Sequence, residues 1–447
     1  MADQPRLPLE GVRVLDITLV WSGPAATRLM GELGAEVIRV ESCRRFPSST
    51  RGPSPDPEQA RRAQATNPAG QTLGYPGNDP GPDPYNRFGP FILNGVNKLS
   101  CTMELDTPEG REAFHALVRQ SDVLVENNHL AGGDSIGLTW DELAAVNPRL
   151  ILVRMAPFGL SGPYAPALGF GTHFESITGI RALRGYPDAG LEEAGPTYHM
   201  DDTSASGVVF AVLAALMHRD RTGRGQLVEF AQVENLMQGV GEAFLDVAMN
   251  GRVPPVMGNR HPLVLQGCYP CRGDDAWLAL HIATDAEWEG LVEAMGRPAW
   301  AREPRVADAA GRRAHQEEID RHLAAWTASW DKMDLFHHLA RHGVPAAPVA
   351  TAADVLADPH LEARGFWRSL THPAAGTYRY PGPVARWSGG PWRWERPAPL
   401  LGEHNAYVYG ELLGYDAATL RDWEERGLVG TRYRVGPADD PRPARTP

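Results

Sequence analysis

The sequence predicts an α/β protein with two domains. A complete strand–helix–strand unit lies near the N-terminus, and strands and helices continue to alternate as far as about residue 160. This alternation favours one parallel sheet covered by helices. The chain of 447 residues is also long enough for a second core, since single hydrophobic cores stop growing at about 250–300 residues.

The first unit begins the predicted sheet. Residues 12–18 form an apolar, β-branched run of the kind that becomes a buried strand. Pro24 stands where the first helical residue is expected, Gly34 ends the helical stretch, and residues 35–40 are the second strand. Because ligands of parallel sheets bind at the carboxyl ends of the strands, residues 19–23 are the predicted binding loop.

The binding loop has free amides that suit an anion. The stretch Ser22-Gly23-Pro24-Ala25-Ala26-Thr27 does not match the GxGxxG pattern, and Pro24 has no amide hydrogen to donate. A dinucleotide site of the NAD type is therefore disfavoured.

The segment 43–89 interrupts the alternation. It is rich in Pro, Gly and Arg and has little periodicity, which indicates an irregular loop. Because it follows a strand end, it either covers the binding site or is a disordered insertion. After it, strands are predicted over 99–105, 122–125 and 150–155, and helices over 107–120 and 140–146.

A change of pattern after residue 226 predicts the smaller domain. It begins with an alternating strand over 226–231 and a helix over 234–249. The predicted boundaries are 1–220 for the N-terminal part of a large domain, 226–345 for a smaller α+β domain, 350–435 for a part that returns to the large domain, and 436–447 for a tail.

Composition excludes several classes of partner. The formal charge of −12 argues against nucleic acid and anionic membrane surfaces. From the sequence, we expect no apolar run long enough to span a bilayer, and the N-terminus lacks the pattern of a secretory signal. We therefore expect a cytoplasmic protein. The four cysteines include one Cys-x-x-Cys pair, Cys268 and Cys271, without a second pair or clustered His, so no metal site is predicted.

The chain resembles the family III CoA-transferases, a group that also includes 2-methylacyl-CoA racemases. The resemblance runs from end to end and is carried by short motifs in the family's order. They are Leu9 to Glu41, Asn97-Lys98-Leu99-Ser100, Asp106 to Arg111, Val125-Glu126-Asn127, Asn147 to Leu150, Gly162-Pro163-Tyr164, Thr222 to Gln226, Gly258 to Pro262, Gly343 to Pro348 and Pro399 to His404.

The resemblance implies a fold, an assembly and a ligand. It implies a large Rossmann-like domain built from both chain ends, a small domain, and an interlocked dimer. It also implies coenzyme A as the acyl carrier, held by residues that match the family's cofactor positions: Val20, Trp21, Ser22, Arg39, Lys98 and Asn127. Leu99 replaces an Arg of the family's pattern, and basic residues of the 43–89 segment, among them Arg44, Arg45 and Arg51, are candidates to bind CoA phosphates instead.

The resemblance also implies a carboxylate nucleophile, an Asp that takes the acyl group from the thioester. Gly171 and Thr172 occupy the matching positions, and neither supplies a carboxylate. Three hypotheses follow. Glu175 is the displaced nucleophile, with His173 nearby; or His173, Glu175, Asp201 and Asp202 perform the proton chemistry of a racemase; or the chain is a non-catalytic subunit. Each of these residues also has a structural reading, as helix face, helix cap or loop acid.

The sequence therefore predicts CoA-thioester chemistry, in the form of CoA transfer between carboxylic acids. Glu175, His173 and Asp201 are the predicted catalytic residues. An acyl-CoA and a carboxylic acid are the predicted substrates, and a homodimer, or a heteromer with a catalytic paralogue, is the predicted assembly. An acyl-CoA racemase or isomerase and a non-catalytic subunit are the alternatives.

Overall fold

The computed structural model describes residues 7–66, 74–197, 199–388 and 392–434. These residues form two compact units. The first contains residues up to 179, 196–241 and from 365 onward, and the second contains 180–195 and 242–364. The predicted tail, 436–447, lies outside the described residues.

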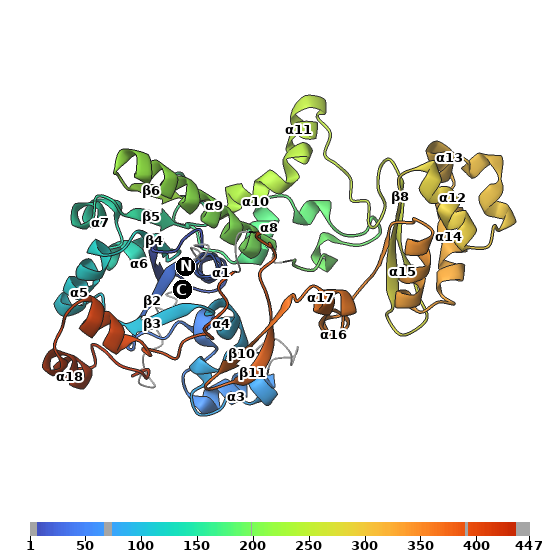
Figure 1. Ribbon diagram of the computed structural model, residues 1–447. Coiled ribbons are helices and arrows are strands. Elements are labelled where there is room, and N and C mark those ends of the chain that lie inside the picture. The colour runs from blue at the N-terminus through green and yellow to red at the C-terminus, as the bar shows by residue number, and fades with distance from the viewer. Residues whose placement is uncertain (1–6, 67–73, 198, 389–391, 435–447) are drawn as a thin grey trace. The chain divides into compact units, whose positions relative to one another are not determined.

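The first unit is built on a six-stranded parallel sheet (Figure 1). Its strands are β1 (Arg13–Ile17), β2 (Glu36–Glu41), β3 (Lys98–Thr102), β4 (Val123–Glu126), β5 (Ile151–Arg154) and β6 (Gln226–Glu229). They lie in the order β3-β2-β1-β4-β5-β6. The strand order changes direction between β1 and β4, and open α/β sheets bind ligands in the crevice outside such a switch point.

Neighbouring residues of each strand point to opposite faces of this sheet, and both faces are largely buried along β1 to β5, whereas residues of the edge strand β6 alternate between partly buried and exposed. Val14 and Val37 belong to one core, and Leu15 and Ile38 to the other. Both sides of a parallel sheet are covered by helices, so its strands read as continuous apolar runs rather than as alternating ones. This is why the sequence predicts these strands well.

The helices of this unit divide between the two faces. Met30 of α1 and Val208 of α9 pack on one face, while Phe114 of α5, Leu143 of α7 and Trp423 of α18 pack on the other. The bounds are α1 (Ser22–Glu32), α2 (Ser48–Arg51), α3 (Pro57–Thr66), α4 (Gly89–Asn94), α5 (Pro108–Arg119), α6 (Leu130–Ser135), α7 (Trp140–Val146), α8 (Gly171–Ile177), α9 (His199–Thr222), α10 (Gln232–Met237) and α18 (Ala417–Glu425), with a π-helical segment at Ala406–Leu412 and a hairpin of β10 (Trp367–His372) and β11 (Gly376–Pro381).

The C-terminal part returns to the sheet through specific hydrogen bonds. Asn97 Nδ2 donates to the carbonyl of Arg393 at 2.7 Å, and Tyr409 Oη donates to the carbonyl of Thr102 at 2.8 Å. Residues from both ends of the chain therefore build the first unit.

The apolar helix α9 differs from what the sequence predicts. Of the helices in the described ranges, it alone is long and apolar enough to cross a membrane by length and composition, whereas no such run is expected from the sequence. Val208, Val212 and Ala215 of this helix are buried in the core against the sheet. Packing in that core accounts for its apolar composition.

The second unit contains a three-stranded antiparallel sheet in the order β7-β8-β9. Its elements are α11 (Gly241–Asn250), β7 (Leu265–Pro270), β8 (Trp277–Ile282), α12 (Asp285–Ala294), α13 (Ala309–Ala314), α14 (Gln316–Thr327), α15 (Lys332–Arg341), β9 (Ala346–Pro348), α16 (Ala352–Leu356) and α17 (Pro359–Ala363). Leu278, Leu291 and Leu335 belong to its own core.

Three expectations differ from the structure. Gln226–Glu229 is not part of the smaller unit, because it pairs with β5 as the edge strand of the large sheet. The single helix predicted over 234–249 is two helices, α10 and α11. The 43–89 segment is not wholly irregular, since it contains α2 and α3.

Candidate functional site

The loop between β1 and α1 lies at the switch point and is held in an unusual conformation. Val20 has a φ of 66°, which is strained for a β-branched residue and marks positions held by their surroundings. The Val20 amide donates to Thr50 Oγ1 at 2.8 Å. At Gly23, a Cβ atom would lie 2.5 Å from Cβ of Thr18, so only glycine allows α1 to begin this close to β1.

Asn127 joins this loop to the end of β4. Its Oδ1 accepts from the Leu19 amide at 2.6 Å, and its Nδ2 donates to the Leu19 carbonyl at 2.9 Å. The neighbouring Asn128 Nδ2 donates to the carbonyl of Ile17 at 3.0 Å. The two asparagines therefore bridge β1 and β4 where the strand order changes.

Ser22 and Asp201 bring together the N-termini of α1 and α9. The backbone and side chain of Ser22 lie close enough to Asp201 to lower the pKa of its carboxyl group. Trp21 makes no side-chain cap for α1, so its side chain leaves the first amides of this helix without an acceptor. Burial, together with the charge of Asp202, nevertheless raises the pKa of Asp201 to about 6.

A cavity of about 570 Å³ opens beside Asp201, and we call it the acyl cavity. Its walls come from the β1–α1 loop, residues 46–50, the end of β4, the segment before α8, and the start of α9. The residues that line it include Val20, Trp21, Ser22, Asn127, Leu130, Leu168, Phe170, Gly171, Phe174, Met200, Asp201 and Gln232.

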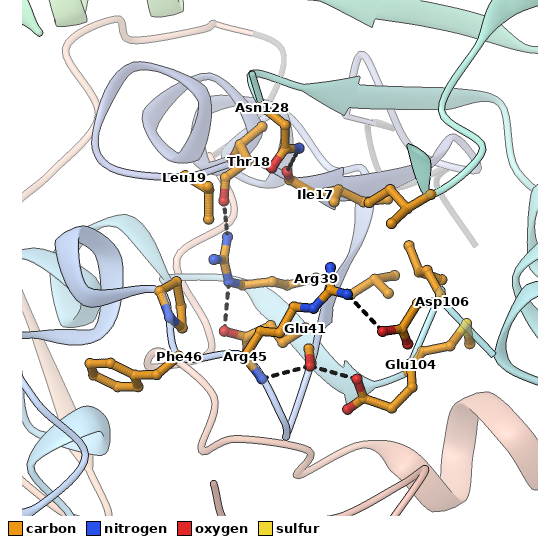
Figure 2. Close-up of a pocket in the computed structure, with 16 residues that line it drawn as sticks. Ile17, Thr18, Leu19, Arg39, Glu41, Arg45, Phe46, Glu104, Asp106 and Asn128 are labelled. Atoms are coloured by element: carbon orange, nitrogen blue, oxygen red, sulfur yellow. Dashed lines mark hydrogen bonds and ion pairs between the residues drawn. The ribbon is translucent and has the colours of Figure 1, made fainter. Parts of the chain in front are cut away.

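A second cavity of about 260 Å³ lies over the carboxyl ends of β1, β2 and β3, and we call it the strand-end cavity (Figure 2). Arg39 lies in its floor, and Arg45 pairs with Asp106 at 2.7 Å on its wall. The two cavities share Leu19, Phe46, Pro47 and Asn128 among their lining residues. The two cavities therefore lie next to each other, on either side of these four residues.

Buried ion pairs support the floor of these cavities. Lys98 Nζ donates to Asp16 Oδ2 at 2.8 Å, to the Pro24 carbonyl at 2.8 Å and to Thr27 Oγ1 at 2.7 Å. All three of its protons are thus used inside the protein, and burial lowers its pKa to about 8 despite Asp16. Lys98 thus links β3 to β1 and α1 inside the protein, and its contact with a cofactor stays a prediction.

Arg39 and Arg51 share Glu41. Arg39 Nε lies 3.1 Å from Glu41 Oε1, and Arg39 Nη1 donates to the Thr18 carbonyl at 3.1 Å (Figure 2). Arg51 Nε donates to Glu41 Oε1 at 2.9 Å, and its guanidinium lies 3.6 Å from the centre of the Phe91 ring. Burial alone would raise the pKa of Glu41, but Arg51 and Arg39 outweigh it and lower this pKa to about 2.

Of the predicted catalytic residues, only one lines the acyl cavity. Asp201 lines the acyl cavity, whereas Glu175 and His173 are absent from its lining. Glu175 is buried and accepts from the amide and hydroxyl of Thr197, the latter at 2.7 Å. His173 is exposed, and its Nδ1 accepts from the Phe170 amide at 3.0 Å, as a cap of α8.

The predicted cofactor residues lie around the loop in different ways. Val20, Trp21, Ser22 and Asn127 line the acyl cavity. Arg39 reaches the strand-end cavity. Gly171, where the resemblance implies a carboxylate, lies in the first turn of α8 and also lines the acyl cavity.

Sequence reasoning missed Thr50 and Gln232. Gln232 Oε1 accepts from the Ser22 hydroxyl at 2.9 Å, and its Nε2 donates to the Met155 carbonyl at 2.9 Å. Neither residue belongs to a recognisable motif, and only the fold brings them to the loop. The position of the 43–89 segment after β2 was the one usable signal for Thr50, because residues 46–50 do line the site.

The residues that the structure describes include no group of three or more His, Cys, Asp or Glu that could hold a metal ion.

Comparison with known proteins identifies the family of this chain. The model of CoA-transferase family III matches residues 9–405. The succinyl-CoA–D-citramalate CoA-transferase of Chloroflexus aurantiacus is 32% identical over 92% of this chain and 96% of its own length. The beta subunit of the succinyl-CoA–L-malate CoA-transferase of the same organism is 30% identical over 95% of this chain and 98% of its own length.

A solved structure extends the comparison to the fold. The crystal structure of a CAIB/BAIF family protein from Brucella suis superimposes with a TM-score of 0.75 and 28% identity, over 91% of this chain and 100% of that one. The family assignment and the class of activity predicted from the sequence, a CoA-transferase acting on CoA thioesters and acids, are confirmed by these matches. The chain belongs to CoA-transferase family III.

Proposed function

We propose that this protein transfers coenzyme A between two carboxylic acids, with the nucleotide end of CoA in the strand-end cavity and the acyl end in the acyl cavity. The observation that supports the proposal is that the two cavities are neighbours that share Leu19 and Phe46, with one carboxylate, Asp201, on the lining of the second. An acyl-CoA is an elongated molecule with a charged end and a reactive end, and this arrangement fits it.

Arg45 is the basic residue of the 43–89 segment that suits a CoA phosphate best. It lines the strand-end cavity, and its side chain remains 62% exposed in its pair with Asp106. Arg51 is fully buried against Glu41, and Arg44 donates to the carbonyls of Gly427 and Arg426. Arginine binds phosphate through two parallel hydrogen bonds.

Asp201 is the carboxylate placed for the chemistry. In the proposed first step, its oxygen attacks the thioester carbonyl carbon, the carbon–sulfur bond breaks, and CoA leaves as a thiolate with an acyl-aspartyl anhydride remaining on the protein. The thiolate then attacks the aspartyl carbonyl, releases the first acid as its carboxylate and leaves an aspartyl-CoA thioester. The second acid reverses both steps, so that every electron pair is returned and no co-reactant is needed.

The surroundings of Asp201 suit this role. The free amides at the start of α1 are donors for the oxyanion that develops at the thioester carbonyl. A pKa of about 6 leaves Asp201 ionised at neutral pH and more basic than an ordinary Asp. Glu175, which the sequence also nominates, is held instead by Thr197 outside the cavity lining.

Isotope exchange tests the proposal. A carboxylic acid is incubated in isotopically labelled form with its own unlabelled CoA thioester and the full chain. Transfer is measured by mass spectrometry as the label that enters the thioester. We expect exchange with the native protein and at least a 100-fold loss in Asp201→Asn, while Glu175→Gln retains exchange. Intact-protein mass should show an acyl or CoA adduct on the native protein that is absent from Asp201→Asn.

The controls separate the alternatives. Label exchange in Asp201→Asn together with its loss in Glu175→Gln would transfer the nucleophilic role to Glu175. Washout of the α-hydrogen in deuterated water without label exchange would identify racemase chemistry. Absence of both reactions from the purified chain would identify a subunit that needs a partner.

The proposal also includes a homodimer and a cytoplasmic location. The homodimer is supported by the apolar helix α11, none of whose residues is buried within the chain. Phe244, Leu245, Val247 and Met249 of this helix are exposed. Exposed apolar patches of this kind mark protein interfaces. A heteromer is the alternative, since one relative named above is the beta subunit of its enzyme.

A further inference from the structure

We infer that the acids handled by this protein are monocarboxylates with a bulky apolar body, aryl or branched alkyl, rather than small dicarboxylates. The inference rests on the proposed function, because it assigns the acyl cavity to the acid. It names the substrate class that the wall of this cavity selects.

The wall of the acyl cavity is largely apolar. Trp21, Leu130, Leu168, Phe170, Phe174 and Met200 all line it. Phe174 and Met200 are buried, while Leu168 and Phe170 remain exposed at its edge. An apolar substituent placed here removes both its own surface and that of these side chains from water, which favours binding.

The charges at this cavity also disfavour a dicarboxylate substrate. Among the residues described for its lining, the ionisable side chains are Asp201 and His129. Asp202 and Glu175 act on Asp201 as further negative charges, because both contribute to raising its pKa. A second carboxylate on the substrate would have to leave water for an apolar wall close to these acids, which is unfavourable unless a cation pairs with it.

The volume of the cavity supports the same class. About 570 Å³ is within the range of pockets that enclose a ligand of drug size. A four-carbon or five-carbon dicarboxylate would leave much of this space unfilled. Citramalate and malate, named in the relatives' activities, are small dicarboxylic acids, so this chain would differ from those relatives in its substrate and not in its reaction.

The self-exchange assay tests the inference with a panel of acids. The probes are 3-phenylpropanoate and 4-methylpentanoate on one side, and succinate and glutarate on the other, each with its own CoA thioester and with a protein-free control. We expect kcat/KM for the apolar acids to exceed that for the dicarboxylates at least about 10-fold, the scale on which apolar pockets discriminate.

A variant adds a permanently charged cation to this wall. Leu168→Arg places a guanidinium at the edge of the acyl cavity, on a side chain that is 72% exposed and so can change without loss of core packing. We expect the ratio of succinate to 3-phenylpropanoate exchange to rise at least 10-fold. Val384→Arg is the matched control, because Val384 is 85% exposed and lines neither cavity, and its ratio should stay within twofold of the native one.

The outcomes are distinct. Exchange of succinate or glutarate as fast as that of the apolar acids overturns the inference and leaves the proposed CoA transfer intact. Exchange of none of the four acids, with no adduct on Asp201, overturns the proposed function and the inference together. An unchanged ratio in Leu168→Arg, with a folded protein by circular dichroism, also counts against the assignment of this wall to the acid.

Discussion

Asn127 and Leu19 are joined by two hydrogen bonds, one from the Leu19 amide to Asn127 Oδ1 at 2.6 Å and one from Asn127 Nδ2 to the Leu19 carbonyl at 2.9 Å. The side-chain amide of Asn127 thus pairs with the backbone of Leu19 as a neighbouring strand would, across the switch point between β1 and β4. It holds the loop that carries Val20 at φ 66° and Ser22 next to Asp201. The sequence marks Asn127 as a residue near CoA, and the structure shows how it shapes the loop.

Asn127→Ala removes both bonds and should lower kcat/KM for acyl-CoA at least 10-fold, since small displacements of a positioned site are costly in rate. Steady-state kinetics measure the effect. Asn147→Ala is the matched control, because Asn147 Nδ2 also donates to two backbone carbonyls, those of Val118 and Ser121, both at 2.9 Å. Equal losses of activity in both variants would assign Asn127 a merely structural role.

The pH profile of the reaction should show the ionisation of Asp201. Because burial and Asp202 raise the pKa of Asp201 to about 6, and because the ionised form is the nucleophile, kcat/KM should rise as the pH increases through about 6 and then level off. Asp202→Asn removes a neighbouring negative charge, so the midpoint should move to lower pH while activity at neutral pH remains. A midpoint that stays in place would exclude Asp201 as the titrating group.

Arg51 should matter for stability rather than for chemistry. Arg51→Leu leaves the buried Glu41 with Arg39 alone, and we expect the free energy of unfolding to fall by about 3 kcal/mol, as for other broken buried pairs. Chemical denaturation measures this loss. Arg45→Leu breaks the exposed pair with Asp106, whose side chains are 62% and 41% exposed, and should cost no more than about 1 kcal/mol. Equal losses would mean that burial of the Arg51 pair contributes nothing.

Acid should weaken the same network. The pKa of Glu41 is about 2 in the folded protein against an ordinary value of 4.5. A carboxyl group with a lowered pKa stabilises the folded state above its ordinary pKa, and this contribution disappears as the pH falls from about 4.5 towards 2. Denaturation midpoints across this range should fall steeply in the native protein and less steeply in Glu41→Gln. Parallel slopes would show that other carboxylates dominate acid unfolding.

The exposed helix α11 should drive self-association. Met249→Glu places a charge on a side chain that is 77% exposed within the chain. If α11 lies in a dimer interface, the burial of that charge should weaken association at least 10-fold, as measured by light scattering during size-exclusion chromatography over a dilution series. Val384→Glu introduces the same charge at a site that is also exposed and should leave the mass unchanged. A native protein that is monomeric at all concentrations would contradict the proposed dimer.

Local sequence determined much of the sheet. Strand β4 lies within the predicted range 122–125 to one residue, helix α7 begins and ends where the pattern predicts, and Thr107 caps α5 by accepting from the Gly110 amide at 3.1 Å. Apolar runs, caps and prolines act over a few residues, so their effects are written in the chain next to the element they shape. The family resemblance likewise identified CoA-transferase chemistry, because its motifs lie in order along the whole chain.

Only the tertiary structure decided which of the nominated residues share a site. The sequence nominates Glu175 as a displaced nucleophile and Asp201 as an acid/base residue, yet Asp201 lines the acyl cavity and Glu175 is bound to Thr197. Lys98 matches a cofactor position in the family pattern, yet the fold turns all three of its protons to internal acceptors. Thr50 and Gln232 reach the β1–α1 loop across 30 and 210 residues of chain. Contacts of this kind depend on strand order and helix packing, which no local pattern encodes. These contacts decide whether a carboxylate faces a cavity or is bound within the protein.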